Sequence, residues 1–346
     1  MDTRARSTHK TLIALAKITL GVAILAYLLW QVQQHDGFRR LIEEPKNWSF
    51  LAAGLCCTFI AVTLGFIRWH ILVTALGLKF RVVDALRLGS LGFMLNFVTL
   101  GSIGGDLFRA IFLARQQPGR RTHAVATVVA DRVMGLLTML TLASAGVLAA
   151  DLIATSSREL AVFCRIILAA SAAGWLGVAL VLTVPALSSP WLSELVERIP
   201  IAGKTLGRLV DAVRLYRDEK RQLALAAALS GTLAVFYISS YYFVARGLPV
   251  HEPSWTQHLV IVPIASLAGA IPATPNGLGT LEAAIEVLYR AMPGSREVVA
   301  GDGTMVALAH RVTMMAVAMV GMAYYLSHRA EVREMIHEAE EAPEMA

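Results

Sequence analysis

Hydrophobic residues gather along the chain in long blocks separated by short polar segments. Six blocks have the length of a membrane span, at about 11–32, 48–76, 123–150, 160–184, 223–245 and 304–327. A helix needs roughly 20 apolar residues to cross the hydrocarbon core of a bilayer. The pattern therefore predicts an all-α polytopic membrane protein with about six full spans.

Two further apolar regions are broken in the middle. Region 85–115 is interrupted by the glycine-rich segment 101–106, and region 257–290 by the proline- and glycine-rich segment 272–279. Each half is about 10–16 residues long, mostly too short to cross a membrane at about 1.5 Å per residue. Broken backbone at membrane depth requires protein or a water-filled cavity around it. We therefore expect two re-entrant helical hairpins.

The order of these elements suggests an internal repeat within a single integral membrane domain covering 1–346. Spans one and two, the first hairpin and span three form repeat one, about 11–150. Spans four and five, the second hairpin and span six form repeat two, about 160–327. Each set crosses an odd number of times, so the two would be inverted, as in many secondary transporters.

Composition and charge narrow the class of protein. The chain is 56% hydrophobic and 16% charged, whereas soluble domains are about 45–50% apolar and about 25% charged. These values exclude an ordinary cytosolic enzyme and a disordered protein. The three cysteines, Cys56, Cys57 and Cys164, lie in apolar runs without metal-ligand spacing, so no metal and no cofactor are expected.

The formal charge of +6 reflects topology and not nucleic-acid binding. With the N-terminus inside, inner segments hold 18 Lys and Arg residues, outer segments hold 7, and the remaining six lie within apolar segments. The positive-inside rule then predicts a multi-pass protein of the cytoplasmic (inner) membrane with both termini cytoplasmic. The basic segment at about 190–222 is read either as an amphipathic helix on the inner leaflet or as a plain connector.

Ionisable residues inside the apolar segments are the candidate site. Their insertion costs roughly 2.5–3.5 kcal/mol each at the bilayer centre. An acid follows glycines in each hairpin and an Arg lies on the next span: Asp106 with Arg132, 26 residues later, and Glu282 with Arg311, 29 residues later. Structural ion pairs are one interpretation, and two half-sites of a polar cavity are the other. Arg68 lies deeper in its span and could also reach the inner surface.

Three Arg residues in one cavity, Arg109, Arg132 and Arg311, suit a phosphate, which a guanidinium binds with two hydrogen bonds. The acids would neutralise these Arg residues when the cavity is empty, or meet an amine when it is occupied. The residues expected to bind substrate are Asn96, Gly104, Gly105, Asp106, Arg109, Asp131, Arg132, Pro275, Gly277, Gly279, Glu282 and Arg311. The candidates for proton coupling are Glu282, Glu286 and His310. No catalytic residue is assigned.

These motifs resemble the transmembrane region of lysylphosphatidylglycerol synthases, within the wider flippase-like family of membrane proteins, over about residues 10–327. The resemblance rests on Asn96 with the Gly-Gly-Asp-x-x-Arg motif ending at Arg109, on Asp131-Arg132, on the proline–glycine element from Pro272 to Glu282, and on His310-Arg311. The family commonly has a proline shortly after the asparagine, where this chain has Leu100-Gly101.

The resemblance implies lipid translocation or handling. Full-length synthases add a soluble aminoacyl-transferase domain that no segment of this chain is long enough to form, so aminoacylation is not implied. The substrate would be an anionic phospholipid, an aminoacyl-phospholipid or a lipid-linked glycan or glycolipid. The sequence contains no P-loop motif, so transport driven by ATP hydrolysis would need a partner protein.

Two other functions stay open at this point. One is a membrane-embedded transferase acting on a lipid-linked donor, with an acid as general base and an Arg holding the leaving group. The other is a scaffold that presents lipid to a lipid-synthesising partner enzyme. The expected partner in all cases is a membrane lipid with a phosphate-containing headgroup, and nucleic acid is not expected.

Overall fold

The computed structural model describes residues 2–98, 104–116, 120–184, 214–271, 273–294 and 297–327. Within these residues the chain forms helices and no strand. This confirms the predicted all-α class. Most of the basic segment at 190–222, namely 190–213, lies outside the described residues.

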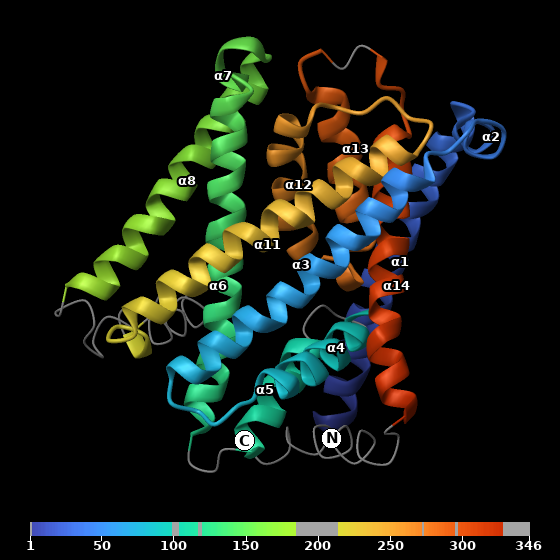
Figure 1. The fold of residues 1–346 in the computed structure, drawn as a ribbon. Helices are drawn as coiled ribbons and strands as arrows, with labels where there is room; N and C mark the ends of the chain where they lie inside the picture. Colours follow the sequence, from blue (N-terminus) through green and yellow to red (C-terminus); the bar gives the residue numbers. More distant parts are fainter. Residues whose placement is uncertain are drawn as a thin grey trace.

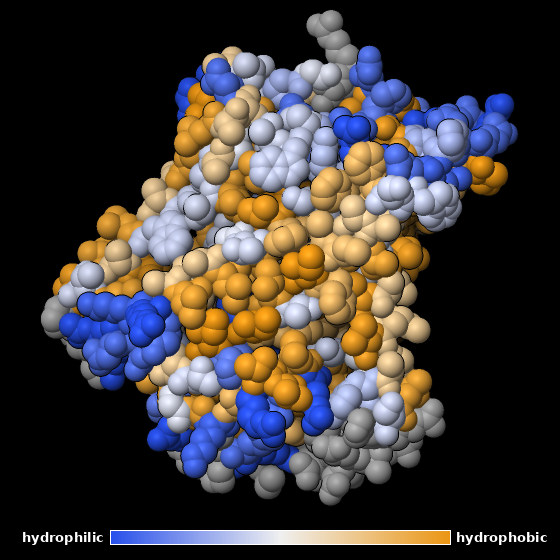
Figure 2. Space-filling model, viewed as in Figure 1, coloured by the Kyte–Doolittle hydropathy of each residue, from blue (hydrophilic) through white to orange (hydrophobic). Residues whose placement is uncertain are grey.

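Six long helices account for the predicted spans. They are α1 (Asp2–Gln34), α3 (Trp48–Ala75), α6 (Arg121–Ala149), α8 (Arg158–Thr183), α11 (Lys220–Gly247) and α14 (Asp302–Ser327). Each contains an apolar stretch long enough to cross a bilayer. Figure 2 shows the consequence for the surface, since orange apolar side chains form a band between two bluer, polar ends. The chain is a multi-pass membrane protein.

Shorter helices occupy the two interrupted regions. They are α4 (Val82–Val98) and α5 (Gly104–Gln116) in the first region, and α12 (Trp255–Ala270), the 3-10 turn η2 (Pro275–Gly277) and α13 (Thr280–Ala291) in the second. The helices of each region pack against each other, so each region is a helical hairpin. Two further short helices, α2 (Gly37–Glu43) and α7 (Leu152–Thr155), lie at the polar end that is uppermost in Figure 1.

The two hairpins point toward each other from opposite ends of the molecule. In Figure 1 the α4–α5 hairpin rises from the lower end, and the α12–α13 hairpin descends from the upper end. Helices α3 and α11 pack side by side and cross the molecule diagonally in front of them. The beginning of α1 and the end of α14 lie at the same, lower end.

Two groups of buried side chains hold the hairpins in place. The larger joins α12 and α13 to α6, α11 and α14, and includes Ile261, Val262 and Ile285. The smaller joins α4 and α5 to α3, and includes Trp69 and Leu91. Each hairpin therefore has its own buried cluster, and both hairpins also pack against α6 and α14. A cavity remains between the two hairpins.

Candidate functional site

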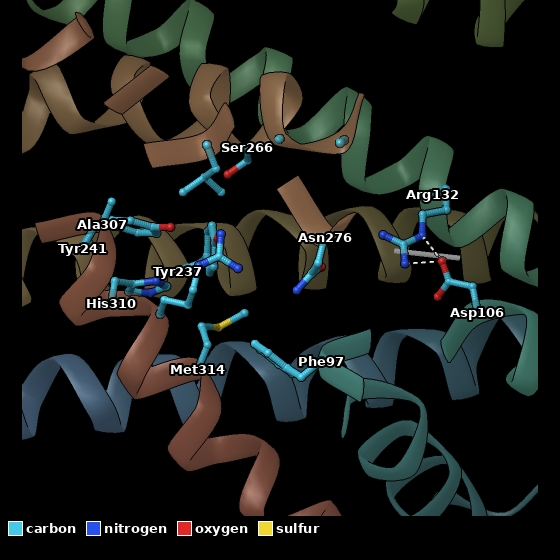
Figure 3. A pocket seen from close by; sticks show the side chains of 14 residues that line it. Phe97, Asp106, Arg132, Tyr237, Tyr241, Ser266, Asn276, Ala307, His310 and Met314 are labelled. Carbon is cyan, nitrogen blue, oxygen red and sulfur yellow. Dashed lines mark hydrogen bonds and ion pairs between the residues drawn. The ribbon is translucent and has the colours of Figure 1, made fainter. Parts of the chain in front are cut away.

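A cavity of about 850 Å³ lies between the two hairpins. Both hairpins and the long helices α6, α11 and α14 contribute to its lining. In Figure 3, Asp106 and Arg132 lie at one end, Asn276 lies in the middle, and Tyr237 and His310 lie at the other end. The cavity is therefore polar at separate points along its length.

The first half-site is formed by Asp106 and Arg132. Asp106 lies in the first turn of α5, and its Oδ2 atom accepts a hydrogen bond from Arg132 Nε at 2.6 Å. The hairpin closes just before this carboxylate, where the Gly105 N–H donates to Asn96 Oδ1 at 3.1 Å. Gly105 also lies against the Gly92 backbone so closely that a Cβ would overlap it. Asn96 and Gly105 thus position Asp106.

The second half-site is formed by Glu282 and Arg311. Arg311 Nε donates to Glu282 Oε1 at 2.6 Å, and the Gly279 N–H donates to Glu282 Oε2 at 2.7 Å. Glu282 is fully buried. The turn before it needs glycines, because Gly277 and Gly279 have φ angles of 64° and 84°. Pro275 begins η2, where its fixed φ angle suits the first position of a turn.

The two half-sites share one construction. In each, an acid in the first turn of the returning helix pairs with an Arg on the following long helix. In each, a glycine packs against the backbone of a glycine on the preceding helix, Gly105 against Gly92 and Gly277 against Gly269. The pairing that the sequence spacing suggested is therefore present, with Arg132 and Arg311 both lining the cavity. Headgroup binding by these residues stays a prediction.

Asp131 belongs to a different ion pair. Arg68 Nε donates to Asp131 Oδ1 at 2.9 Å, and Arg68 Nη1 donates to the Ser230 hydroxyl at 3.1 Å. Arg68 and Asp131 are both buried, and neither is among the described residues that line the cavity. Arg68 does not reach the surface, because Asp131 and Ser230 satisfy its guanidinium inside the protein.

Arg109 lies close to Asp106 but does not hydrogen-bond to it. Its Nη1 atom is 3.9 Å from Asp106 Oδ1, too far for a hydrogen bond. Its guanidinium carbon lies over the rings of Trp69 and Phe66, at 5.2 and 5.7 Å from the ring centres, within the range of cation–π interactions. Arg109 is buried and is not among the described lining residues.

The three candidates for proton coupling lie in different surroundings. Glu282 is in the second half-site. His310 lines the cavity, contacts the Ser240 hydroxyl through Nε2 at 2.8 Å, and stacks on Tyr241 at 3.6 Å. Glu286 instead accepts from the N–H groups of Gly301 and Thr304 at 2.8 and 2.9 Å. Glu286 therefore caps the N-terminus of α14, which favours a structural role.

Several lining residues were not singled out from the sequence. Asn276 has φ 49° and ψ 33°, a left-handed conformation that is uncommon outside glycine. Its position between Pro275 and Gly277 in a turn was the available signal. Tyr237 lies in the long helix α11 and Ser266 in the shorter apolar helix α12, and nothing in their spacing marks them as lining residues.

Comparison with known proteins agrees with the motifs and with the helical fold. No match was found among curated proteins. The family model of the lysylphosphatidylglycerol synthase TM region matches residues 14–321, which include both hairpins and all four residues of the half-sites. The chain therefore belongs to the family of the lysylphosphatidylglycerol synthase TM region.

Proposed function

We propose that the protein moves a lipid with a phosphate-containing headgroup between the leaflets of the cytoplasmic membrane. Membership of this family indicates a lipid-related role in a membrane. The observation that carries the finer proposal is the cavity of about 850 Å³ between two hairpins that enter from opposite ends, with Asp106, Arg132 and Arg311 of the two half-sites in its walls.

The proposal treats both hairpins as re-entrant. Their helices are 17 and 13 residues long in the first hairpin, and 16 and 12 residues long in the second. Polar backbone at the hairpin tips would then face the cavity and not the acyl chains. By the positive-inside rule, we assign the end where α1 begins and α14 ends to the cytoplasm. The headgroup would meet the two half-sites in turn as it crosses.

The chemistry of the half-sites fits a phosphate. A guanidinium offers two parallel N–H donors that match two phosphate oxygens. In the absence of lipid each guanidinium is neutralised by its own carboxylate, which lowers the cost of holding charge at membrane depth. A phosphate would compete with Asp106 for Arg132, or with Glu282 for Arg311. Glu282 and His310 are the candidates for coupling this exchange to protons.

The ion pairs favour transport over a transferase activity. A general base has to be available to take a proton from the reacting group. Asp106 and Glu282, the acids of the two half-sites, each accept hydrogen bonds from an Arg. Both acids are therefore already paired with an arginine, and these arginines line the cavity, where they can bind and release an anion.

Reconstituted vesicles test the proposal. Acyl-labelled phosphatidylglycerol is placed in both leaflets, and a membrane-impermeant quencher then reports the label that remains in the inner leaflet. Vesicles containing the protein, with or without a proton gradient, should lose inner-leaflet label faster than protein-free vesicles. Equal rates under both conditions would reject translocation of this lipid class.

A further inference from the structure

A second cation, Arg109, lies beside the first half-site. Arg132 and Arg109 both face the single carboxylate of Asp106. The neighbouring Asp131 does not balance the excess, because it is paired with Arg68. Among the described residues, the cluster of Arg68, Arg109, Arg132, Asp106 and Asp131 therefore has a formal charge of +1. Uncompensated charge is costly in a buried site, so an anion would complete it.

We propose that Arg109 is an alternative counter-ion of Asp106. When Asp106 pairs with Arg109, Arg132 is released to bind a lipid headgroup with one net negative charge. The inference rests on the proposed function and narrows its substrate class. A phosphodiester headgroup without an amine would bring the cluster to neutrality. A zwitterionic headgroup would leave the excess charge in place.

The geometry of Asp106 supports an exchange of partners. Its Oδ2 atom receives both contacts from Arg132. Its Oδ1 atom has Arg109 Nη1 at 3.9 Å and no hydrogen bond to any described residue. A side-chain rotation that releases Arg132 would bring Asp106 toward a cation that is already beside it.

Arg109 is free to receive the carboxylate. Its Nε atom is buried and has no hydrogen-bond partner among the described residues. Its only salt-bridge contact there is the long one to Asp106, and its guanidinium also lies over the rings of Trp69 and Phe66. A buried guanidinium without a full partner favours forming one when a carboxylate becomes available.

The second half-site lacks this arrangement. Both oxygens of Glu282 are engaged, one by Arg311 and the other by the Gly279 N–H. No second described Arg forms an ion pair with Glu282. Release of Arg311 would leave Glu282 buried without a cation, so a phosphate is expected to bind first at Arg132.

Equilibrium binding to the full chain in phosphatidylcholine nanodiscs tests the exchange. The probe is acyl-labelled phosphatidylglycerol, with acyl-labelled phosphatidylcholine as the zwitterionic comparison. R109Q should weaken phosphatidylglycerol binding by about tenfold or more, and R109K should weaken it less than R109Q does, because it keeps the charge although it loses the planar group over the rings. Phosphatidylcholine binding should change little in either variant.

The decisive variant is D106N. If Asp106 competes with the phosphate for Arg132, D106N should strengthen phosphatidylglycerol binding, and D106N/R109Q should recover most of the binding lost in R109Q. Misfolding only weakens binding, so a gain in D106N is informative even if R109Q fails to fold. Weaker binding in D106N, or no recovery in the double variant, would overturn the proposal.

Two further arms separate the ligand source and the function. Displacement of the probe by inorganic phosphate at the concentration of the lipid would overturn the lipid assignment, and its failure to displace supports it. Binding does not require movement between leaflets. The predicted binding pattern without translocation would therefore keep this site and reject the proposed function, while translocation without the pattern would reject only the exchange.

Discussion

The Gly92 carbonyl oxygen occupies the space that a Cβ on Gly105 would need. This contact joins α4 to the beginning of α5, and the Gly105 N–H donates to Asn96 Oδ1 beside it. The closeness of the two backbones fixes where Asp106 enters the cavity. The shape of the first hairpin thus depends on glycine at position 105, which has no side chain.

Gly105→Ala should therefore open the first hairpin. We expect a loss of about 1–3 kcal/mol in stability from overpacking, together with slower lipid movement because Asp106 shifts from Arg132. Thermal unfolding followed by circular dichroism in detergent measures the first effect. Gly65→Ala is the matched control, since a Cβ at that α3 glycine has no neighbour within 4 Å. Equal melting temperatures for G105A and the unmodified chain would contradict this account.

Asn276 offers a test that separates backbone from side chain. Its left-handed conformation suits glycine, so Asn276→Gly should keep the turn, whereas Asn276→Ala should strain it by roughly 1 kcal/mol. Because the Asn276 side chain lies in the cavity, both variants should slow lipid movement. If N276G moves lipid as fast as the unmodified chain, the amide has no part in the cavity's function.

The sequence was sufficient for the large-scale fold. Long apolar blocks correspond to the six long helices because length and hydrophobicity alone decide whether a helix spans a bilayer. The two hairpins were also predictable, since segment 272–279 cannot continue a helix. The acid–Arg pairing was suggested by equivalent positions in the two hairpins.

The pairing of partners within the buried polar network was harder to predict from the sequence. Arg68 and Asp131 are 63 residues apart and lie on helices whose contact depends on how the long helices cross. Glu286 and Glu282 share one face of α13, yet Glu286 caps α14 and Glu282 pairs with Arg311. The two carboxylates lie one helical turn apart along α13, and their spacing in the sequence does not distinguish the two roles.

The Arg68–Asp131 pair should be structural. Arg68→Met or Asp131→Leu alone leaves a buried charge without its partner and should cost about 3–5 kcal/mol. The double variant R68M/D131L removes both charges and should recover most of that stability. The unfolding free energies of the three variants and of the unmodified chain give the coupling energy. Lipid movement lost in a well-folded double variant would instead place Asp131 in the transport site.

Glu286 should matter for stability and not for proton coupling. Glu286→Gln weakens the charge-assisted contacts to Gly301 and Thr304 and should destabilise the start of α14 by about 1–2 kcal/mol. The dependence of lipid movement on pH should stay unchanged. A shifted pH profile in E286Q, measured in vesicles at matched protein content, would return Glu286 to the coupling candidates.

The central claim is that the arginines of the two half-sites bind the headgroup as it crosses. The most direct measurement compares the rate of phosphatidylglycerol movement in vesicles for R132Q, R311Q and the control R246Q. Arg246 pairs with Glu252 and is not among the described lining residues of the cavity. We predict losses of about tenfold or more for R132Q and R311Q and an unchanged rate for R246Q. Rates for R132Q and R311Q equal to that of R246Q, at equal folding, would contradict the account.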